Sequence, residues 1–270
     1  MNQIHPTAIV HPGAQLGDEV QIGPYAVIDE HVVLGDRCRV GPQVYLTGHT
    51  VIGTDNRFHA GCVIGDAPQD LKYHGEPTRL RIGAHNTFRE HVTVHRSNKM
   101  EEDTVVGSHN FFMAGAHVAH NCRLGDHNIM ANGATLAGHV TLHDRAFLSG
   151  YTLIHQFTRV GSLALMRGGA AISQDLPPFC IATGENHLCG LNTIGLRRAG
   201  FSAADRAELK RLYHRLFRGD EPRRAALDRA QKEFSSTPAR TLLDFLASSR
   251  RGWCSDRATR AHPADAAEGD

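Results

Sequence analysis

Three short segments hold the histidines best placed to do chemistry: residues 115–122 (GAHVAHNC), 136–140 (LAGHV) and 154–157 (IHQF). The ordinary pKa of a histidine side chain, about 6.5, leaves it mostly neutral at cytoplasmic pH, so it can accept a proton as a general base. Histidines at a defined geometry can instead bind zinc, and this chain has 19 histidines. Proton transfer and metal binding are therefore both open, although His117 and His120 alone do not make a zinc site.

A repeat of six residues must position these segments. Apolar residues recur at every sixth position from Ile4 to Ile64 without a miss, and again over 82–94 and 106–172. This period does not match a helix, in which each glycine would also cost about 1 kcal/mol. We interpret each repeat as a short strand plus a turn, and three repeats as one triangular coil. Stacked coils would pair as parallel strands around a narrow apolar core.

The coil also predicts the roles of two other positions in the repeat. The position two before each apolar point is predicted to face inward, which makes Cys38, Cys62 and Cys122 inert thiols. Glycine recurs one position after the apolar point, as at Gly35 and Gly107, which we interpret as a corner that needs unusual φ and ψ. Most of the other histidines fall at corners or on the outer face and are predicted to have no catalytic role.

The repeat is interrupted at residues 66–79 and 96–103, which are predicted to be external loops. Loops that leave a rigid solenoid are where sites usually gather. The solenoid is assigned to residues 1–190.

The C-terminal quarter follows a helical pattern instead. Residues 191–252 are predicted to form a small helical domain with three helices, the first capped by Ser202 and the others opened by Pro222 and Pro238. Residues 253–270 are predicted to be a frayed, disordered tail.

Composition and charge exclude several classes of protein. With 41% hydrophobic residues, 21% charged residues and a net charge of +1, nothing points to nucleic acid. The N-terminus has no signal pattern and no apolar run is long enough to span a membrane, so we expect a cytoplasmic protein. Residues 195–252 hold 14 Lys and Arg against 7 Asp and Glu. This excess reflects either solvated helix faces or a docking surface for an acidic partner, formed by Arg197, Arg198, Arg206, Lys210, Arg211 and Arg215.

Several motifs together resemble one known family. Besides the three histidine segments they are 69–73 (QDLKY), 75–79 (GEPTR), 93–96 (TVHR), 174–178 (QDLPP) and 192–198 (NTIGLRR). In this order, from the N-terminus to about residue 252, the chain resembles the acyl-[acyl-carrier-protein]–UDP-N-acetylglucosamine O-acyltransferases.

The resemblance implies a fold, an assembly and a reaction. The fold is an all-β solenoid plus α, a left-handed parallel β-helix of hexapeptide repeats with a small C-terminal α-helical domain. The assembly is a homotrimer with active sites in clefts between subunits. The reaction moves a 3-hydroxyacyl group from acyl carrier protein to the 3-hydroxyl of UDP-N-acetylglucosamine, the first step of lipid A biosynthesis, without a metal or another cofactor. Acyl carrier protein is expected to dock on the basic C-terminal face.

Site residues are also implied by the resemblance. His120 is the general base, and the backbone N–H of Gly138 faces the thioester oxyanion. Gly168 lies at the end of the acyl groove, and its missing side chain predicts a preference for longer hydroxyacyl chains. Sugar, diphosphate, nucleotide or acyl donor would be positioned by Gln69, Asp70, Lys72, His95, His117, His139, His155, Gln156, Asn192 and Arg198.

Two positions depart from the family pattern. Asn121 stands where Asp is common, so that a neutral amide would orient His120, and Ile194 stands where an acidic residue is frequent. Three other functions stay open: N-acylation of the 3-amino analogue of the sugar, a metal hydrolyase of the γ-carbonic-anhydrase type, and a scaffold without catalytic activity.

Overall fold

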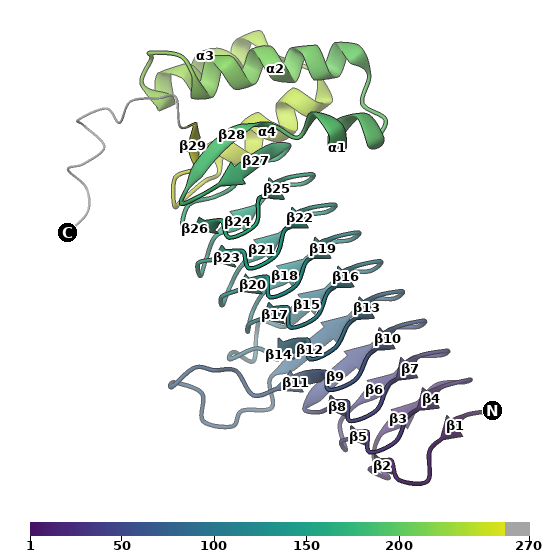
Figure 1. Ribbon diagram of the computed structural model, residues 1–270. Helices are drawn as coiled ribbons and strands as arrows, with labels where there is room; N and C mark the ends of the chain where they lie inside the picture. The colour runs from purple at the N-terminus through teal and green to yellow at the C-terminus, as the bar shows by residue number, and fades with distance from the viewer. Residues whose placement is uncertain (257–270) are drawn as a thin grey trace.

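The chain folds into a tall three-sided coil with a helical cap (Figure 1). The computed structural model describes residues 1–256. Successive short strands pass in turn through three sheets, here named A, B and C, and each strand of a coil pairs in parallel with a strand of the next coil. Figure 1 shows the coils stacked from the N-terminus toward the helices.

The strands of the three sheets are short and regular. Sheet A holds β1 (Gln3–Ile4), β4 (Gln21–Ile22), β7 (Arg39–Val40), β10 (Arg57–Phe58), β13 (Thr87–Phe88), β16 (Phe111–Phe112), β19 (Ile129–Met130), β22 (Phe147–Leu148), β25 (Leu165–Met166), β27 (Cys180–Thr183), β28 (His187–Leu191) and β29 (Ser255–Asp256). Sheet B holds β2 (Ile9–Val10), β5 (Val27–Ile28), β8 (Tyr45–Leu46), β11 (Val63–Asp66), β14 (Thr93–His95), β17 (His117–Val118), β20 (Thr135–Leu136), β23 (Leu153–Ile154) and β26 (Ala171–Ile172). Sheet C holds β3 (Gln15–Leu16), β6 (Val33–Leu34), β9 (His49–Ile52), β12 (Arg79–Ile82), β15 (Thr104–Val106), β18 (Arg123–Leu124), β21 (Thr141–Leu142) and β24 (Arg159–Val160).

Strand register fixes the length of a coil. Gln3 pairs with Gln21 and Ile4 with Ile22, so partners lie three six-residue repeats apart, as predicted. The apolar points of the repeat are buried from Ile22 onward, where coils lie on both sides. Ile4 is 46% exposed because no coil lies beneath the first one.

The second inward position is buried as well from Val20 onward, whether its side chain is apolar or polar. Its asparagines form a ladder: the backbone N–H of Asn86 donates to Oδ1 of Asn56 at 2.9 Å, and that of Asn110 donates to Oδ1 of Asn86 at 2.8 Å. The cysteines at this position are free and buried. Burial raises the pKa of the Cys62 and Cys122 thiols to about 12, which keeps them protonated and inert.

The glycine that follows the apolar point is explained by coil stacking, and our dihedral interpretation was wrong. A Cβ at Gly35 would lie 2.7 Å from the backbone carbon of Gly53, and one at Gly107 would lie 2.6 Å from the backbone oxygen of Gly125. Neither Gly35 nor Gly107 has a positive φ. Positive φ falls two positions further on, where Glu19, Tyr25, Arg37, Asp55, His85, His109, Asn121, His127 and His139 occur.

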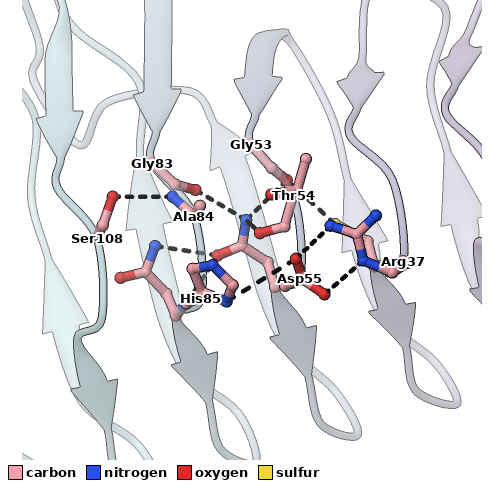
Figure 2. Close-up of polar contacts among 11 residues, drawn as sticks. Arg37, Gly53, Thr54, Asp55, Gly83, Ala84, His85 and Ser108 are labelled. Atoms are coloured by element: carbon pink, nitrogen blue, oxygen red, sulfur yellow. Dashed lines mark hydrogen bonds and ion pairs between the residues drawn. The ribbon is translucent and has the colours of Figure 1, made fainter.

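Positive-φ residues at the edge between sheets C and A form a polar column. Figure 2 shows Arg37 and His85 on either side of Asp55. Arg37 donates to both carboxylate oxygens of Asp55, at 2.9 and 2.7 Å, and this hydrogen bonding lowers the pKa of the carboxyl. The rings of His85, His109 and His127 continue the column, stacked at centroid distances of 4.8 Å.

Both interruptions of the repeat leave the solenoid at the edge between sheets B and C. Residues 67–78 connect β11 to β12, and residues 96–103 connect β14 to β15. Since β11, β14 and β17 are neighbours in sheet B, the two loops lie next to the coil that carries His120.

The solenoid ends in an antiparallel hairpin of β27 and β28, followed by four helices. These are α1 (Thr193–Arg198), which the sequence analysis missed, α2 (Ala203–Phe217), α3 (Arg223–Glu233) and α4 (Thr237–Ala247). Ser202 caps α2 in a capping box with Asp205, and Pro238 lies in the first turn of α4. The three predicted helices are therefore present.

The predicted tail is wrong in its first four residues. Cys254 is buried, and Ser255 pairs with His187 because the outer edge of β28 would otherwise lack a partner. The hydroxyl of Tyr213 and Nε of Arg218 both donate to Asp256 at 2.8 Å. The remainder of that prediction, residues 257–270, lies outside the described residues.

Candidate active site

The candidate site lies on the edge between sheets B and C, where three coils stack. The backbone N–H of His139 donates to the carbonyl of His120 at 3.0 Å, and that of Phe157 donates to the carbonyl of Gly138 at 3.1 Å. These bonds place the three histidine segments of the sequence one above another. The structure thus brings His120, Gly138 and His139 together, as the sequence motifs required.

His120 is held on one side of its ring. Its Nδ1 lies 2.9 Å from Oδ1 of Asn121, a residue that is 6% exposed. The ring of His139 stands perpendicular to it at a centroid distance of 5.3 Å, and His139 also stacks on Phe157 at 4.5 Å. No hydrogen bond of His120 Nε2 is found within residues 1–256.

Gly138 packs directly on the imidazole of His120. A Cβ at this position would lie 2.6 Å from Cε1 and 2.8 Å from Nε2 of that ring. Within the described part of the chain, the backbone N–H of Gly138 donates no hydrogen bond. A buried donor without a partner is uncommon, since leaving it unsatisfied costs about 1–3 kcal/mol. The corner therefore offers a hydrogen-bond donor next to a possible base.

Two more histidines point outward from sheet B beside this corner. His95 in β14 and His117 in β17 have ring centroids 4.8 Å apart, and Nδ1 of His117 pairs with the hydroxyl of Thr93 at 2.7 Å. Burial lowers the pKa of His117 to about 4, and the nearby His95 and His120 add to the effect. Burial also lowers the pKa of His95, whose Nδ1 is buried without a partner among the described residues.

This depressed pKa predicts acid sensitivity. Between pH of about 6.5 and 4 the unfolded chain binds a proton at His117 that the folded chain does not, so stability falls as the pH drops through this window. Urea unfolding at several pH values, in parallel for the wild type and His117→Gln, measures the effect. The wild type is expected to lose more stability than the variant, and identical pH dependence of the two proteins would contradict the prediction.

Predicted residues of the 67–78 loop reach the same corner to different degrees. Asp70 accepts hydrogen bonds from the backbone N–H of Lys72 at 3.0 Å and from Nδ2 of Asn98 at 2.6 Å. These bonds lower the pKa of Asp70, and the nearby His120 contributes to the shift. Gln69 and the Lys72 side chain are exposed on the loop.

A groove of about 320 Å³ lies on the outer face of sheet B above His120. It is lined by outward residues of β20, β23 and β26 and by corner residues, among them Thr135, Ala137, Leu153, His155, Ala171 and Ser173. Leu153 is 55% exposed, which gives the groove an apolar floor. His155 is a lining residue, the neighbouring Gln156 is exposed, and Gly168 lies at the opposite edge of the same sheet, before β26.

The last two predicted residues, Asn192 and Arg198, lie at the start and the end of helix α1, which follows β28 of sheet A. Asn192 caps α1: its Oδ1 accepts from the backbone N–H of Gly195 and its Nδ2 donates to the carbonyl of Leu163, both at 2.9 Å. Arg198, at the end of α1, is exposed. Among the described residues, neither of them contacts His120.

Three residues of the 96–103 loop that the sequence analysis did not single out contact this corner. Asn98, Ser97 and Glu102 all hydrogen-bond to Asn121. Their only signal in the sequence was the break in the repeat itself, which shows that a loop leaves the coil but not where its side chains point.

Two features are absent from the described residues. Across residues 1–256, no group of three or more His, Cys, Asp or Glu is arranged to hold a metal ion. Over the same range, no helix is long and apolar enough to cross a membrane.

Comparisons with known proteins agree with this arrangement. Residues 31–66 and 103–138 match the bacterial transferase hexapeptide family, and residues 175–254 match the second domain of UDP N-acetylglucosamine O-acyltransferases. A curated acyl-[acyl-carrier-protein]–UDP-N-acetylglucosamine O-acyltransferase of Janthinobacterium sp. is 49% identical over 93% of this chain and 99% of its own length. The corresponding protein of Halorhodospira halophila is 44% identical, with the same coverage of both chains.

Solved structures support the same relation. UDP-N-acetylglucosamine acyltransferase from Bacteroides fragilis matches with a TM-score of 0.90 and 37% identity over 93% of this chain and 99% of that one. The enzyme from Francisella novicida matches with a TM-score of 0.90 and 33% identity over 96% and 99%. The left-handed parallel β-helix with a small helical domain is thereby confirmed. With such identity over nearly its full length, the chain is an acyltransferase that belongs to the acyl-[acyl-carrier-protein]–UDP-N-acetylglucosamine O-acyltransferase family.

Proposed function

We propose that this chain transfers a (3R)-3-hydroxyacyl group from acyl carrier protein to the 3-hydroxyl of UDP-N-acetylglucosamine, in the first step of lipid A biosynthesis. Nε2 of His120 removes the hydroxyl proton as the sugar oxygen attacks the thioester carbon. The N–H of Gly138 donates to the oxyanion of the tetrahedral intermediate. Collapse of that intermediate breaks the C–S bond, and the imidazolium returns the proton to the leaving phosphopantetheine thiolate.

One observation carries the proposal: an imidazole held at Nδ1 packs against a glycine whose backbone N–H has no partner within residues 1–256. A base and an oxyanion donor must lie within a few ångströms of one reacting carbon, and this corner supplies both. The names of the relatives favour an oxygen acceptor over the 3-amino analogue.

The remaining predicted residues fall into three groups according to their position in the fold. Asp70, His95, His117 and His139 surround His120 and would hold the sugar and diphosphate, with Gln69 and Lys72 above them. His155 and Gln156 would contact the acyl donor at the groove. Asn192 and Arg198 lie beyond sheet A and would hold the nucleotide of a neighbouring subunit's site, which requires the homotrimer.

An apolar stripe favours that assembly. Phe111, Ile129, Phe147 and Leu165 are the outward residues of four adjacent strands of sheet A, and each is only partly buried in one subunit. A contiguous apolar patch of this kind is typical of a protein interface.

The basic face of the helical domain is the proposed docking surface for acyl carrier protein. Lys210, Arg211 and Arg215 are exposed on α2, and Arg197 and Arg198 are exposed on α1. Two of these cations have partners: Arg206 donates to the carbonyl of Phe201, and Arg215 lies 3.9 Å from a carboxylate oxygen of Glu233. A surface of one sign attracts an oppositely charged partner and speeds its binding. The predicted cytoplasmic location belongs to the same proposal.

Acyl transfer from 3-hydroxyacyl carrier protein tests the reaction, with UDP-N-acetylglucosamine and its 3-amino analogue run side by side. Mass and base lability of the product distinguish an ester from an amide. An ester on the normal sugar is expected. An amide on the amino sugar alone would change the acceptor but keep the mechanism, and no product with either would favour the metal hydrolyase or the scaffold.

Chain-length preference is the next expected outcome. Gly168 is exposed, and a Cβ there would meet only the carbonyl of Gly150 at 3.6 Å, so nothing fills the position where the acyl groove is proposed to end. Long 3-hydroxyacyl donors should outcompete medium ones in a mixed assay. Gly168→Met should shift the preference toward shorter chains, because its side chain fills this end of the groove. A wild-type preference for medium chains would refute the assignment.

A further inference from the structure

Glu102, a loop residue without an assigned role, contacts the group that orients His120. Its carboxylate oxygen Oε2 lies 3.2 Å from Nδ2 of Asn121 and 3.8 Å from Nδ1 of His139. Oδ1 of Asn121 lies 2.9 Å from Nδ1 of His120. A continuous path of contacts therefore runs from a carboxylate, through a buried amide, to the proposed base.

Hydrogen bonds determine which way the Asn121 amide faces. The backbone N–H of Asn98 donates to Oδ1 at 3.1 Å, so this atom is an acceptor. Nδ2 donates to Oγ of Ser97 at 2.7 Å and to the Glu102 carboxylate. Since an amide oxygen cannot donate, Nδ1 of His120 must carry the hydrogen of their contact. The neutral ring then keeps its lone pair on Nε2, on the side of Gly138.

The carboxylate reinforces an orientation of the amide that two other contacts also favour. The backbone N–H of Asn98 can only donate, so it requires Oδ1 on its side. The hydroxyl of Ser97 donates to the carbonyl of Lys99 at 3.0 Å, so its oxygen accepts from Nδ2 of Asn121. A carboxylate accepts only, and it therefore selects the orientation in which Nδ2 faces Glu102 and Oδ1 faces His120.

We propose that Glu102 is a positioning residue for acyl transfer, which supplies the negative charge that Asn121 lacks and, together with Asn98 and Ser97, holds Asn121 in the orientation that leaves Nε2 of His120 free. This inference rests on the proposed function of the site. Glu102 acts through Asn121 and touches neither the substrate nor the reacting atoms.

Other charged groups face His120 as well. Asp70 approaches from the 67–78 loop, His95 from β14, His117 from β17 and His139 from the corner after β20. Lys99 lies 3.6 Å from Oε1 of Glu102 and offsets part of its charge. The carboxylates of Asp70 and Glu102 oppose this group of imidazoles, and that of Asp66 acts on His95.

Glu102→Gln tests the charge, because the side-chain amide keeps an oxygen that can accept from Asn121. The kcat of acyl transfer should fall about 10-fold with little change in KM, as is typical when a hydrogen bond loses its charged partner. The acid limb of the kcat/KM profile should also move to lower pH, because loss of a nearby negative charge disfavours the imidazolium. Glu101→Gln is the matched control: Glu101 is exposed on the same loop and makes none of these contacts, so neither quantity should change.

A double variant separates positioning from a general effect on the loop. Asn121→Asp alone places a second carboxylate against Glu102 and removes the donor that Glu102 uses, so activity should fall strongly. When Glu102→Gln is added, the only carboxylate of this pair is the one introduced at position 121, next to His120. The double variant should therefore be more active than Asn121→Asp alone. Additive losses in this cycle would mean that Glu102 only supports the loop, and would overturn the proposal.

Modification of His120 by diethyl pyrocarbonate, followed against pH by peptide mass spectrometry, needs no acyl donor. The midpoint for His120 should lie at lower pH in Glu102→Gln than in the wild type. Coincident curves would overturn the role of Glu102 even if the enzyme is active. If the wild type transfers no acyl group but the midpoints still differ, the proposed reaction fails while the orientation of His120 by Glu102 is supported.

Discussion

Replacement of His120 by alanine is expected to lower kcat of acyl transfer by about 10²- to 10⁴-fold, the usual contribution of a positioned general base. The hydroxyl of the sugar is a poor nucleophile until a base takes its proton, and within residues 1–256 the ring nitrogen Nε2 of His120 is bound to nothing else. Initial rates with saturating 3-hydroxyacyl carrier protein and UDP-N-acetylglucosamine measure the effect. The fold should persist, because His120 is only partly buried at a corner and fills no part of the apolar prism.

His11→Ala is the control for this variant. His11 is an exposed histidine on the same edge of the solenoid, at its N-terminal end, where its Nδ1 accepts from the backbone N–H of Gly13 at 3.1 Å. Its loss should leave the rate unchanged. Near wild-type turnover by a folded His120→Ala protein would refute the assignment of the base.

Gly138→Ala is expected to lower kcat by about 10²-fold, the effect of a small misplacement of a catalytic group. The added methyl group would lie 2.6 Å from Cε1 of His120, so the imidazole must move. The same methyl group would crowd the position where an oxyanion approaches the Gly138 N–H. Steady-state rates measure the loss, and thermal unfolding shows whether the coil tolerates the change.

Gly150→Ala is the matched control for Gly138→Ala. Gly150 occupies the same position of the repeat as Gly138, two residues after an apolar point, but a Cβ there would meet only the carbonyl of Asn132 at 3.5 Å. Its turnover should stay near that of the wild type. Equal losses in both variants would attribute the effect to the coil and not to the contact with His120.

The six-residue spacing predicted the solenoid well because a repeat is a global signal. Each of the many coils reports the same geometry, so the inward residues, the parallel pairing and the places where loops leave could all be predicted. The role of the recurrent glycine could not be inferred in the same way. Gly35 is required by the backbone of Gly53 in the next coil, and a contact between coils has no separate signature in the sequence.

The candidate site likewise contains residues that the motifs predicted and residues that depend on contacts between segments. Motifs brought His120, Gly138 and Asp70 to attention, but they said nothing about the path from Glu102 to Asn121, which depends on how a loop folds back on its own coil. Asn192 shows the opposite problem. The motif offered it as a ligand-binding residue, whereas its amide also caps a short helix that the apolar pattern did not reveal.

Coil stacking also limits how this enzyme can change through insertions and deletions. Adding one six-residue repeat between the 96–103 loop and His120 would rotate every later corner by one side of the prism, separating Gly138 from the loops that complete the site. Only whole coils preserve the alignment, and each adds a rise of about 4.8 Å, the spacing of paired strands. The distance between the reacting corner and the end of the groove can therefore change only in large steps through the backbone. We therefore expect finer adjustment of acyl length to come from single side chains at positions such as that proposed for Gly168.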